Sequence, residues 1–285
     1  MPVPLQGVTA LTLVRMFALR QRRRLLIVGE ACVIAALGLQ SPGAAVTTDA
    51  RKHPRGAARL FHWGAPRWDD ESETPTTKSP PMSPDWAINA RSLVKNRWGQ
   101  MLITGRPDGR EVRVTLTGHP HRYGRWEVKV FTHQIKSSSP YRIFAELIPA
   151  GSQAYRCGAK NITLADHVMG THRTRMSIRT LPNRQFSYSA RPYLGPWDFN
   201  TYGVEITKTH ISWFMDDRVV MTERRPAALA GTLYTLRLRL VGNGATDVTP
   251  PRMQLDWSRY FTLQRPNTRS IAAPQAHLGT YSGAC

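Results

Sequence analysis

The sequence predicts an all-β protein built as a sandwich or jelly roll of two sheets. From residue 86 onward, short runs alternate apolar and polar side chains between frequent turn signals, with no long helical pattern and no internal repeat. Apolar residues make up 41 % of the 285-residue chain, which is enough for a sizeable core and excludes a wholly disordered protein. Roughly 200 residues of strands joined by regular turns are typical of a two-sheet sandwich.

The clearest alternating runs indicate individual strands. They are residues 111–117, 126–131, 236–240 and 253–261. Residues 211–215 and 218–221 flank Asp216-Asp217, which predicts a hairpin with a tight turn. Because β-branched and aromatic residues are frequent in these runs, we expect each to be a half-buried strand.

The first 45 residues resemble an export signal in composition. Arginines between residues 20 and 24 precede a 14-residue apolar run from Leu25 to Gly38, and small residues follow up to Ala45. These are the parts of a secretory signal peptide. A spanning helix needs about 20 residues, so a cleaved signal is favoured over an uncleaved anchor and a polytopic membrane protein is excluded. We expect a secreted or cell-envelope protein, with membrane contact only through this signal if it stays uncleaved.

Residues 46–85 are expected to be a disordered linker. An acidic cluster from Asp69 to Glu73 is followed by a stretch dense in Pro, Ser and Thr, a composition that favours extended and solvated backbone. Trp63 and Trp68 are the exceptions, and either could dock onto the folded part. The folded domain is expected to span residues 86–265, with a C-terminal tail over residues 266–285.

Five segments of this domain carry recognisable motifs. They are YGRWEV at residues 123–128, FAELIP at 144–149, DFNTYGVE at 198–205, ISWFMDD at 211–217 and MQLDW at 253–257. In this order they resemble glycoside hydrolase family 16, the laminarinase-like enzymes with a concanavalin A-like jelly roll. The match covers roughly residues 86–263, and it implies the lectin and glucanase type of sandwich.

The active-site strand of that family reads E-[IL]-D-[IV]-x-E, and the segment in the matching place here is NITLAD at residues 161–166. In such a strand a bulge absorbs one extra residue, so that three carboxylates converge on the cleft. The resemblance places Asn161 at the nucleophile, Thr163 at the middle acid and Asp166 at the acid/base position. Retaining hydrolysis needs two carboxyl groups about 5–5.5 Å apart, so the replacements predict an impaired enzyme. A relocated carboxylate such as Glu146 is the alternative that would restore activity.

The resemblance also implies sugar contacts. Tyr155, Tyr193 and Trp197 lie in segments that resemble loops at the edge of the cleft, where aromatic faces can stack on sugar rings. His167 follows Asp166 and could reach a ligand hydroxyl. Ordinary packing in the core is the alternative for each residue, and no metal or cofactor is expected.

Cys157 and Cys285 are the only cysteines beyond the predicted signal. Export favours a disulfide between them, which would pin the tail near the active-site strand. A free cysteine in the tail is equally compatible with the sequence.

The chain is strongly basic, with 39 Lys and Arg against 19 Asp and Glu. Removal of residues 1–45 takes away five Arg and one Glu, which leaves 34 − 18 = +16. The basic residues are spread along alternating strands instead of forming a nucleic-acid motif, so no nucleic-acid partner is expected. Attraction to anionic wall polymers or lipid headgroups fits export better, and a charged surface without a dedicated partner is the alternative.

Two functions remain open from the sequence. The first is an exported domain that binds cell-envelope polysaccharide as a catalytically impaired glycan-binding module. The second is an active, divergent glycosidase or transglycosylase on β-linked glucan or galactan. The missing glutamate at the nucleophile position leaves the enzymatic status of the chain undecided.

Overall fold

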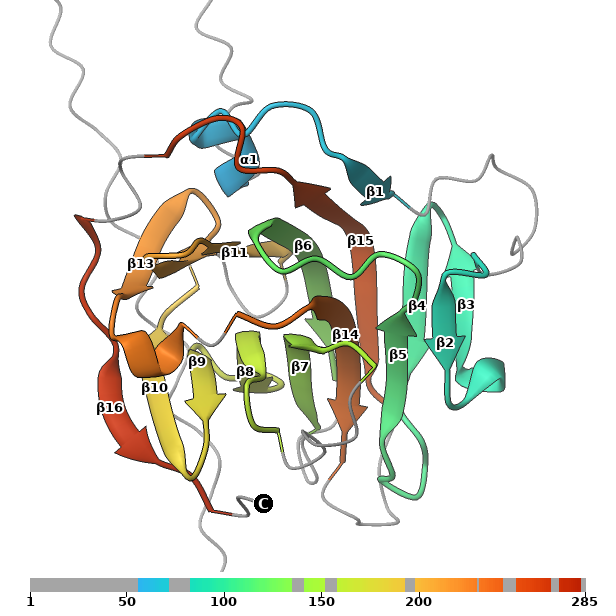
Figure 1. The fold of residues 1–285 in the computed structure, drawn as a ribbon. Coiled ribbons are helices and arrows are strands. Elements are labelled where there is room, and N and C mark those ends of the chain that lie inside the picture. Colours follow the sequence, from blue (N-terminus) through green and yellow to red (C-terminus); the bar gives the residue numbers. More distant parts are fainter. Residues whose placement is uncertain are drawn as a thin grey trace, which may run out of the picture. The chain divides into compact units, whose positions relative to one another are not determined.

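The computed structural model describes residues 56–71, 83–134, 141–151, 158–192, 198–229, 231–242, 250–267 and 272–282. All of these belong to one compact unit, Thr48–Cys285. Its strands form two antiparallel sheets that lie face to face (Figure 1), which confirms the predicted all-β sandwich. In the described part of the chain no helix has the length and apolar character that crossing a membrane requires. The predicted signal at residues 1–45 lies outside the described residues.

The first sheet, sheet A, has the strand order β13-β12-β11-β6-β15-β4-β3, and β1 pairs with the end of β15. Its strands are β1 (Trp68–Asp70), β3 (Val94–Arg97), β4 (Gln100–Thr104), β6 (Gly124–His133), β11 (Asn200–Ile206), β12 (Ile211–Met215), β13 (Arg218–Glu223) and β15 (Arg252–Phe261). The long strands β6 and β15 lie at its centre, so they connect the two halves of the sheet.

The second sheet, sheet B, has the order β16-β10-β9-β8-β7-β14-β5-β2. Its strands are β2 (Trp86–Ile88), β5 (Val112–Leu116), β7 (Arg142–Pro149), β8 (Ile162–Val168), β9 (Thr174–Thr180), β10 (Arg184–Ala190), β14 (Tyr234–Val241) and β16 (His277–Thr280). The described helical elements are short: α1 (Ala57–Leu60) and the 3-10 turns η2 (Arg91–Leu93) and η4 (Pro226–Ala228).

Every strand predicted from an alternating run is present. The predicted hairpin is formed by β12 and β13, and Asp216 at its turn has a φ of 56°. This is the left-handed region that Asp tolerates better than most residues. The Asp216 side chain also accepts a hydrogen bond of 2.9 Å from the Thr201 backbone N–H, which ties the turn to β11.

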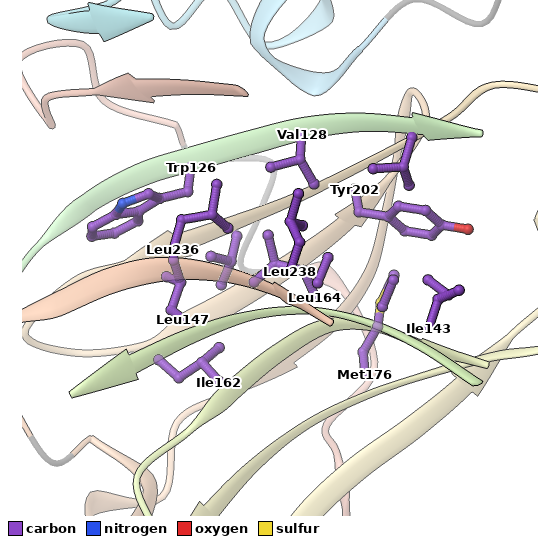
Figure 2. Packing of buried hydrophobic residues seen from close by; sticks show 14 of the residues in the cluster. Trp126, Val128, Ile143, Leu147, Ile162, Leu164, Met176, Tyr202, Leu236 and Leu238 are labelled. Carbon is purple, nitrogen blue, oxygen red and sulfur yellow. The ribbon is translucent and has the colours of Figure 1, made fainter. Parts of the chain in front are cut away.

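The main core fills the space between the two sheets. Trp126 and Val128 of β6 point toward residues of sheet B, among them Leu147, Leu164 and Leu238 (Figure 2). Each of these side chains lies on the face of its strand that is turned toward the other sheet, a face that alternate residues share. The opposite positions of the strands in sheet B are left facing outward, and they build the site described below.

The outer face of sheet A is covered by residues 56–71, which differs from the predicted linker. Trp63 is 3 % exposed and packs edge-on against Phe214, at a ring-centroid distance of 5.1 Å, and against Phe261 at 5.5 Å. The blue segment in Figure 1, with α1 and β1, is therefore part of the folded domain. The two tryptophans that stood out in the sequence dock as expected, since Trp68 also packs against the main core.

Glu127 is buried beneath this N-terminal segment. Its carboxylate accepts a hydrogen bond of 3.0 Å from the Ala58 backbone N–H at the start of α1. A Cβ at Gly56 would lie 2.5 Å from Glu127 Oε1, so a larger residue there would displace the carboxylate. Burial raises the pKa of Glu127 from its ordinary 4.5 to about 7, although the Ala58 and Ala57 amides and the nearby Arg259 charge oppose the shift.

We predict that Glu127 makes the stability of the protein depend on pH. Between about pH 4.5 and 7 the unfolded chain gives up this proton while the folded protein keeps it, so unfolding becomes easier as the pH rises. Relative to E127Q, the wild-type free energy of unfolding should fall by up to about 3 kcal/mol over this range, since one pKa unit corresponds to about 1.4 kcal/mol. Urea unfolding of both proteins at several pH values measures this. A difference between them that does not change with pH would contradict the prediction.

Candidate functional site

A bulge in β8 sets the positions of the candidate site residues. Thr163 pairs with Ser177 of β9 and Asp166 pairs with Arg175, so two residues of β8 lie opposite one residue of β9. These two, Leu164 and Ala165, are both fully buried. Without the extra residue Asp166 would point into the core, because side chains alternate between the two faces of a strand. The bulge returns Asp166 to the outer face, beside Thr163.

This outer face carries a polar pocket of about 160 Å³. Its lining comes from four neighbouring strands and the residue Gly158: Phe144 and Glu146 of β7, Asn161, Thr163 and Asp166 of or beside β8, Arg175, Ser177 and Arg179 of β9, and Arg237 and Arg239 of β14. Arg237 pairs across the strands with Glu146, and Glu146 pairs with Thr163. The lining is thus a grid of side chains held in register by the ladders of sheet B.

Glu146 is buried in this grid and is held by two arginines. Its Oε1 accepts hydrogen bonds from Arg237 Nε at 2.9 Å and Arg239 Nε at 2.5 Å. Its Oε2 accepts from the Asn161 side-chain amide at 3.2 Å. Both carboxylate oxygens therefore already have partners from within the pocket.

Asp166 is held in the same manner by two other arginines. Arg142 forms a two-pronged ion pair with it, and the second of these contacts, from Nη2 to Oδ2, measures 2.9 Å. Arg175 donates to Asp166 Oδ2 from Nε at 3.0 Å and from Nη2 at 2.7 Å. The Arg142 fork bonds both carboxylate oxygens and Arg175 adds two hydrogen bonds to Oδ2, so the carboxylate is fixed in orientation.

The bulge is also supported from the other sheet. Trp213 of β12 is fully buried, and its indole N–H donates a 3.0 Å hydrogen bond to the Thr163 backbone carbonyl. Bulges leave ladder groups without a strand partner. This indole therefore crosses the core to satisfy a carbonyl at the point where β8 is irregular.

A larger hollow, of about 330 Å³, lies beside Arg125, Glu205 and His210. Arg125 and Glu205 are both buried and pair at 2.6 Å, and His210 Nε2 lies 3.0 Å from the other Glu205 oxygen. The remaining Arg125 donors bond the backbone carbonyls of Thr262 and Arg265. These charges satisfy one another, so the hollow is a weaker candidate than the pocket on sheet B.

Comparison with solved structures supports the fold, whereas the comparisons of the sequence give no match. No protein-family model matches the chain, and no curated protein matches it either. Solved structures do match. A non-specific endo-β-1,3(4)-glucanase from family 16 superposes with a TM-score of 0.59 at 15 % identity, covering 70 % of this chain and 94 % of the enzyme. The chain has the fold of the family 16 glycoside hydrolases.

Other structures with this fold agree. The laminarinase from Rhodothermus marinus matches with a TM-score of 0.58 and 17 % identity, over 69 % of this chain and 96 % of the enzyme. A laminarinase from Flavobacterium sp. UMI-01 matches with a TM-score of 0.54 and 15 % identity, over 70 % of this chain and all of the enzyme. At these identities the likeness concerns the fold, while the chemistry rests on the residues of the pocket.

The structure brings together three of the residues singled out from the sequence. Asn161, Thr163 and Asp166 line one wall of the pocket, as the family 16 motif and its bulge predict. Glu146, named as the alternative carboxylate, lines the pocket as well. The roles proposed for these residues stay predictions.

His167 lies away from the pocket. Its cross-strand partner Ile143 is a core residue, so the His167 ring is on the face of β8 opposite to Asp166. Burial lowers the pKa of His167 to about 4, which leaves the ring neutral at pH 7. The structure therefore does not support a sugar contact by His167.

The remaining predicted site residues lie outside the described residues. They are the aromatic residues Tyr155, Tyr193 and Trp197 and the cysteines Cys157 and Cys285. Their roles in stacking and in a disulfide stay predictions. The arginines of the pocket were missed, although the alternation in residues 236–240 already put Arg237 and Arg239 on one face of a strand.

We predict that removing the hydrogen bond of the Trp213 indole lowers the free energy of unfolding by more than the smaller side-chain volume alone would. W213F removes the hydrogen bond from the indole to the Thr163 carbonyl, and the loss of one hydrogen bond costs about 0.5–1.5 kcal/mol. The matched control is W126F, which also shrinks a buried indole but removes no hydrogen bond to β8. Urea unfolding should show W213F to be the less stable variant by that margin, and equal stabilities would contradict the role given to the indole.

Proposed function

We propose that this protein is an exported domain with the family 16 fold that binds cell-envelope polysaccharide and is catalytically impaired. The observation that carries the proposal is the hydrogen bonding of the Asp166 carboxylate. A general acid must present a proton to the glycosidic oxygen. Both Asp166 oxygens instead accept hydrogen bonds from the guanidinium groups of Arg142 and Arg175.

The neutral residues on the same strand add to this argument. Asn161 and Thr163 occupy the pocket wall where the family motif has carboxylates, and neither a side-chain amide nor an unassisted hydroxyl replaces a carboxylate nucleophile. Both retain donors and acceptors that suit sugar hydroxyls. The pocket keeps the means to bind a sugar while it lacks the usual pair of reacting groups.

The ligand class follows from the relatives and from the charge of the chain. The solved structures with this fold include glucanases that act on β-1,3(4)-glucan and laminarinases. The basic region and apolar run at the N-terminus support export, and the excess of Lys and Arg supports attraction to anionic polymers outside the cell. An envelope polysaccharide agrees with both observations, since it is a polysaccharide and lies outside the cell.

The second candidate is an active, divergent glycosidase or transglycosylase on β-linked glucan or galactan. One observation favours it: Glu146 lines the same pocket as Asp166, so two carboxylates are present there. In this scheme one of them would replace the missing nucleophile. Against it, Glu146 is 2 % exposed and is engaged by Arg237, Arg239 and Asn161.

We predict that the purified protein releases no reducing sugar from laminarin, lichenan or galactan above a blank. The blank is the double variant E146Q/D166N, which removes both carboxylates of the pocket. Turnover by the wild-type protein that disappears in E146Q or in D166N would establish the second candidate instead.

We also predict retention of the protein on envelope polysaccharide in affinity electrophoresis. Y193A and W197A should weaken the retention, because the resemblance places both aromatic rings at the edge of the cleft where sugars stack. W98A is the matched control, since Trp98 is 78 % exposed at the turn between β3 and β4 in sheet A, away from the pocket. Retention that neither variant weakens would place the binding surface elsewhere, and no retention at all would overturn the proposed function.

A further inference from the structure

The pocket on sheet B holds more positive than negative side chains. Its lining includes the four arginines Arg175, Arg179, Arg237 and Arg239 and the two carboxylates Glu146 and Asp166, which gives 4 − 2 = +2. Asp166 is shared with a further arginine, Arg142, at the rim. A polar pocket made for neutral sugar hydroxyls does not need this excess, since amides and hydroxyls serve that purpose.

Arg179 is the arginine whose charge is least balanced. Its Nε donates 3.0 Å to the neutral Gln185 side chain, and no described carboxylate forms an ion pair with it. Burial and the neighbouring Arg175 charge lower the pKa of Arg179, and Tyr281, Asp166 and Glu146 only partly oppose them. A half-buried cation next to another cation is a position that an added anion stabilises.

The arginines also keep donors for a ligand. A guanidinium carries five N–H groups, and among the described residues Arg179 and Arg237 each use only Nε in a hydrogen bond. Within the described part of the chain, the terminal nitrogens of both side chains make no hydrogen bond, and the Arg179 guanidinium lies 4.9 Å from the centre of the Tyr281 ring. Guanidinium groups bind sulfate, phosphate and carboxylate oxygens through two parallel hydrogen bonds, which are stronger than bonds between neutral groups.

The positions of the strands hold these donors around one space. Arg175 and Arg179 lie two alternate positions apart on β9, while Arg237 and Arg239 are neighbours on the same face of β14. Strands β8 and β7 lie between them. Thr163 on β8 and Asn161 directly before β8 can bond the sugar itself. The pocket thus offers cationic groups from two sides and neutral polar groups from the strand at its middle.

We propose that this pocket binds a glycan that carries an oxyanion substituent on its sugar ring, with Arg179 as the main contact to that substituent. The inference rests on the proposed function and adds the chemical class of the glycan. The shared chemistry is a sulfate ester, a phosphate ester or a carboxylate, all of which fit a guanidinium fork. Such a ligand supplies the negative charge that the lining lacks.

The test is isothermal titration of the full chain with four oligosaccharide probes. Three probes are charged: a sulfated galactan, a phosphomannan and an oligogalacturonate. The same galactan after desulfation is the fourth probe, and it serves as a neutral control together with laminarin oligosaccharides. At least one charged probe should bind about tenfold or more tightly than the neutral ones, since a hydrogen bond to a charged group contributes about 1.5–3 kcal/mol. The probe that binds identifies which oxyanion is the natural one.

Two variants separate the pocket from the general charge of the surface. R179Q should weaken binding of the charged probe about tenfold and leave binding of neutral sugars unchanged. R91Q removes the same charge from an exposed position on η2, outside the pocket lining, and should change binding by less than twofold. Circular dichroism and urea unfolding confirm that both variants are folded.

Each other outcome is informative. Equal binding of laminarin and the charged probes, unaffected by R179Q, would overturn this inference and leave the proposed function standing. Equal losses in R179Q and R91Q would assign the binding to surface charge and would also overturn it. Binding of none of the probes would count against the proposed function itself.

Discussion

The hydrogen bond from the Trp213 indole to the Thr163 carbonyl connects the two sheets at the bulge of β8. The position of Asp166 in the pocket depends on that bulge, because the bulge decides which side chains of β8 beyond Thr163 face outward. Leu164 and Ala165 can both be buried only if the strand carries one residue more than its neighbour. An indole is suited to this position, since its apolar body fills the core and its single N–H reaches the carbonyl.

The two faces of β8 are under different constraints. The inward face must fill the space between the sheets, so it carries the apolar residues Ile162, Leu164 and Ala165 and, near the end of the strand, the neutral His167. The outward face has to satisfy only its neighbours on β7, β9 and β14, and here it does so through charge: Glu146 and Asp166 are each matched by two arginines. The chain keeps the family 16 fold at 15–17 % identity to the solved structures.

The sequence was sufficient to predict elements whose pattern depends only on residues that are near one another in the chain. Strands such as β5 and β14 are buried on one face, so their alternation was visible, and the motif at residues 161–166 placed the pocket wall through its resemblance. It was insufficient to show what covers the outer face of a strand that is buried on both faces. The β12 strand is apolar on the outside as well, because Phe214 meets Trp63 from a segment 150 residues earlier, and only the tertiary structure reveals that partner. Of the two roles left open for His167, the structure favours packing in the core, since neighbouring residues of a strand point to opposite faces.

The pairing of β1 with β15 joins parts of the chain that are almost 200 residues apart, with Trp68 opposite Tyr260. The central strand β6 likewise lies between β11 and β15, so one of its edges stays open until β15 has been made. Sheet A therefore cannot close while the chain is still being synthesised, and the N-terminal segment has nothing to dock onto during that time. Under the export proposed above, late closure would be an advantage, because a chain that is still open can be threaded through a narrow channel.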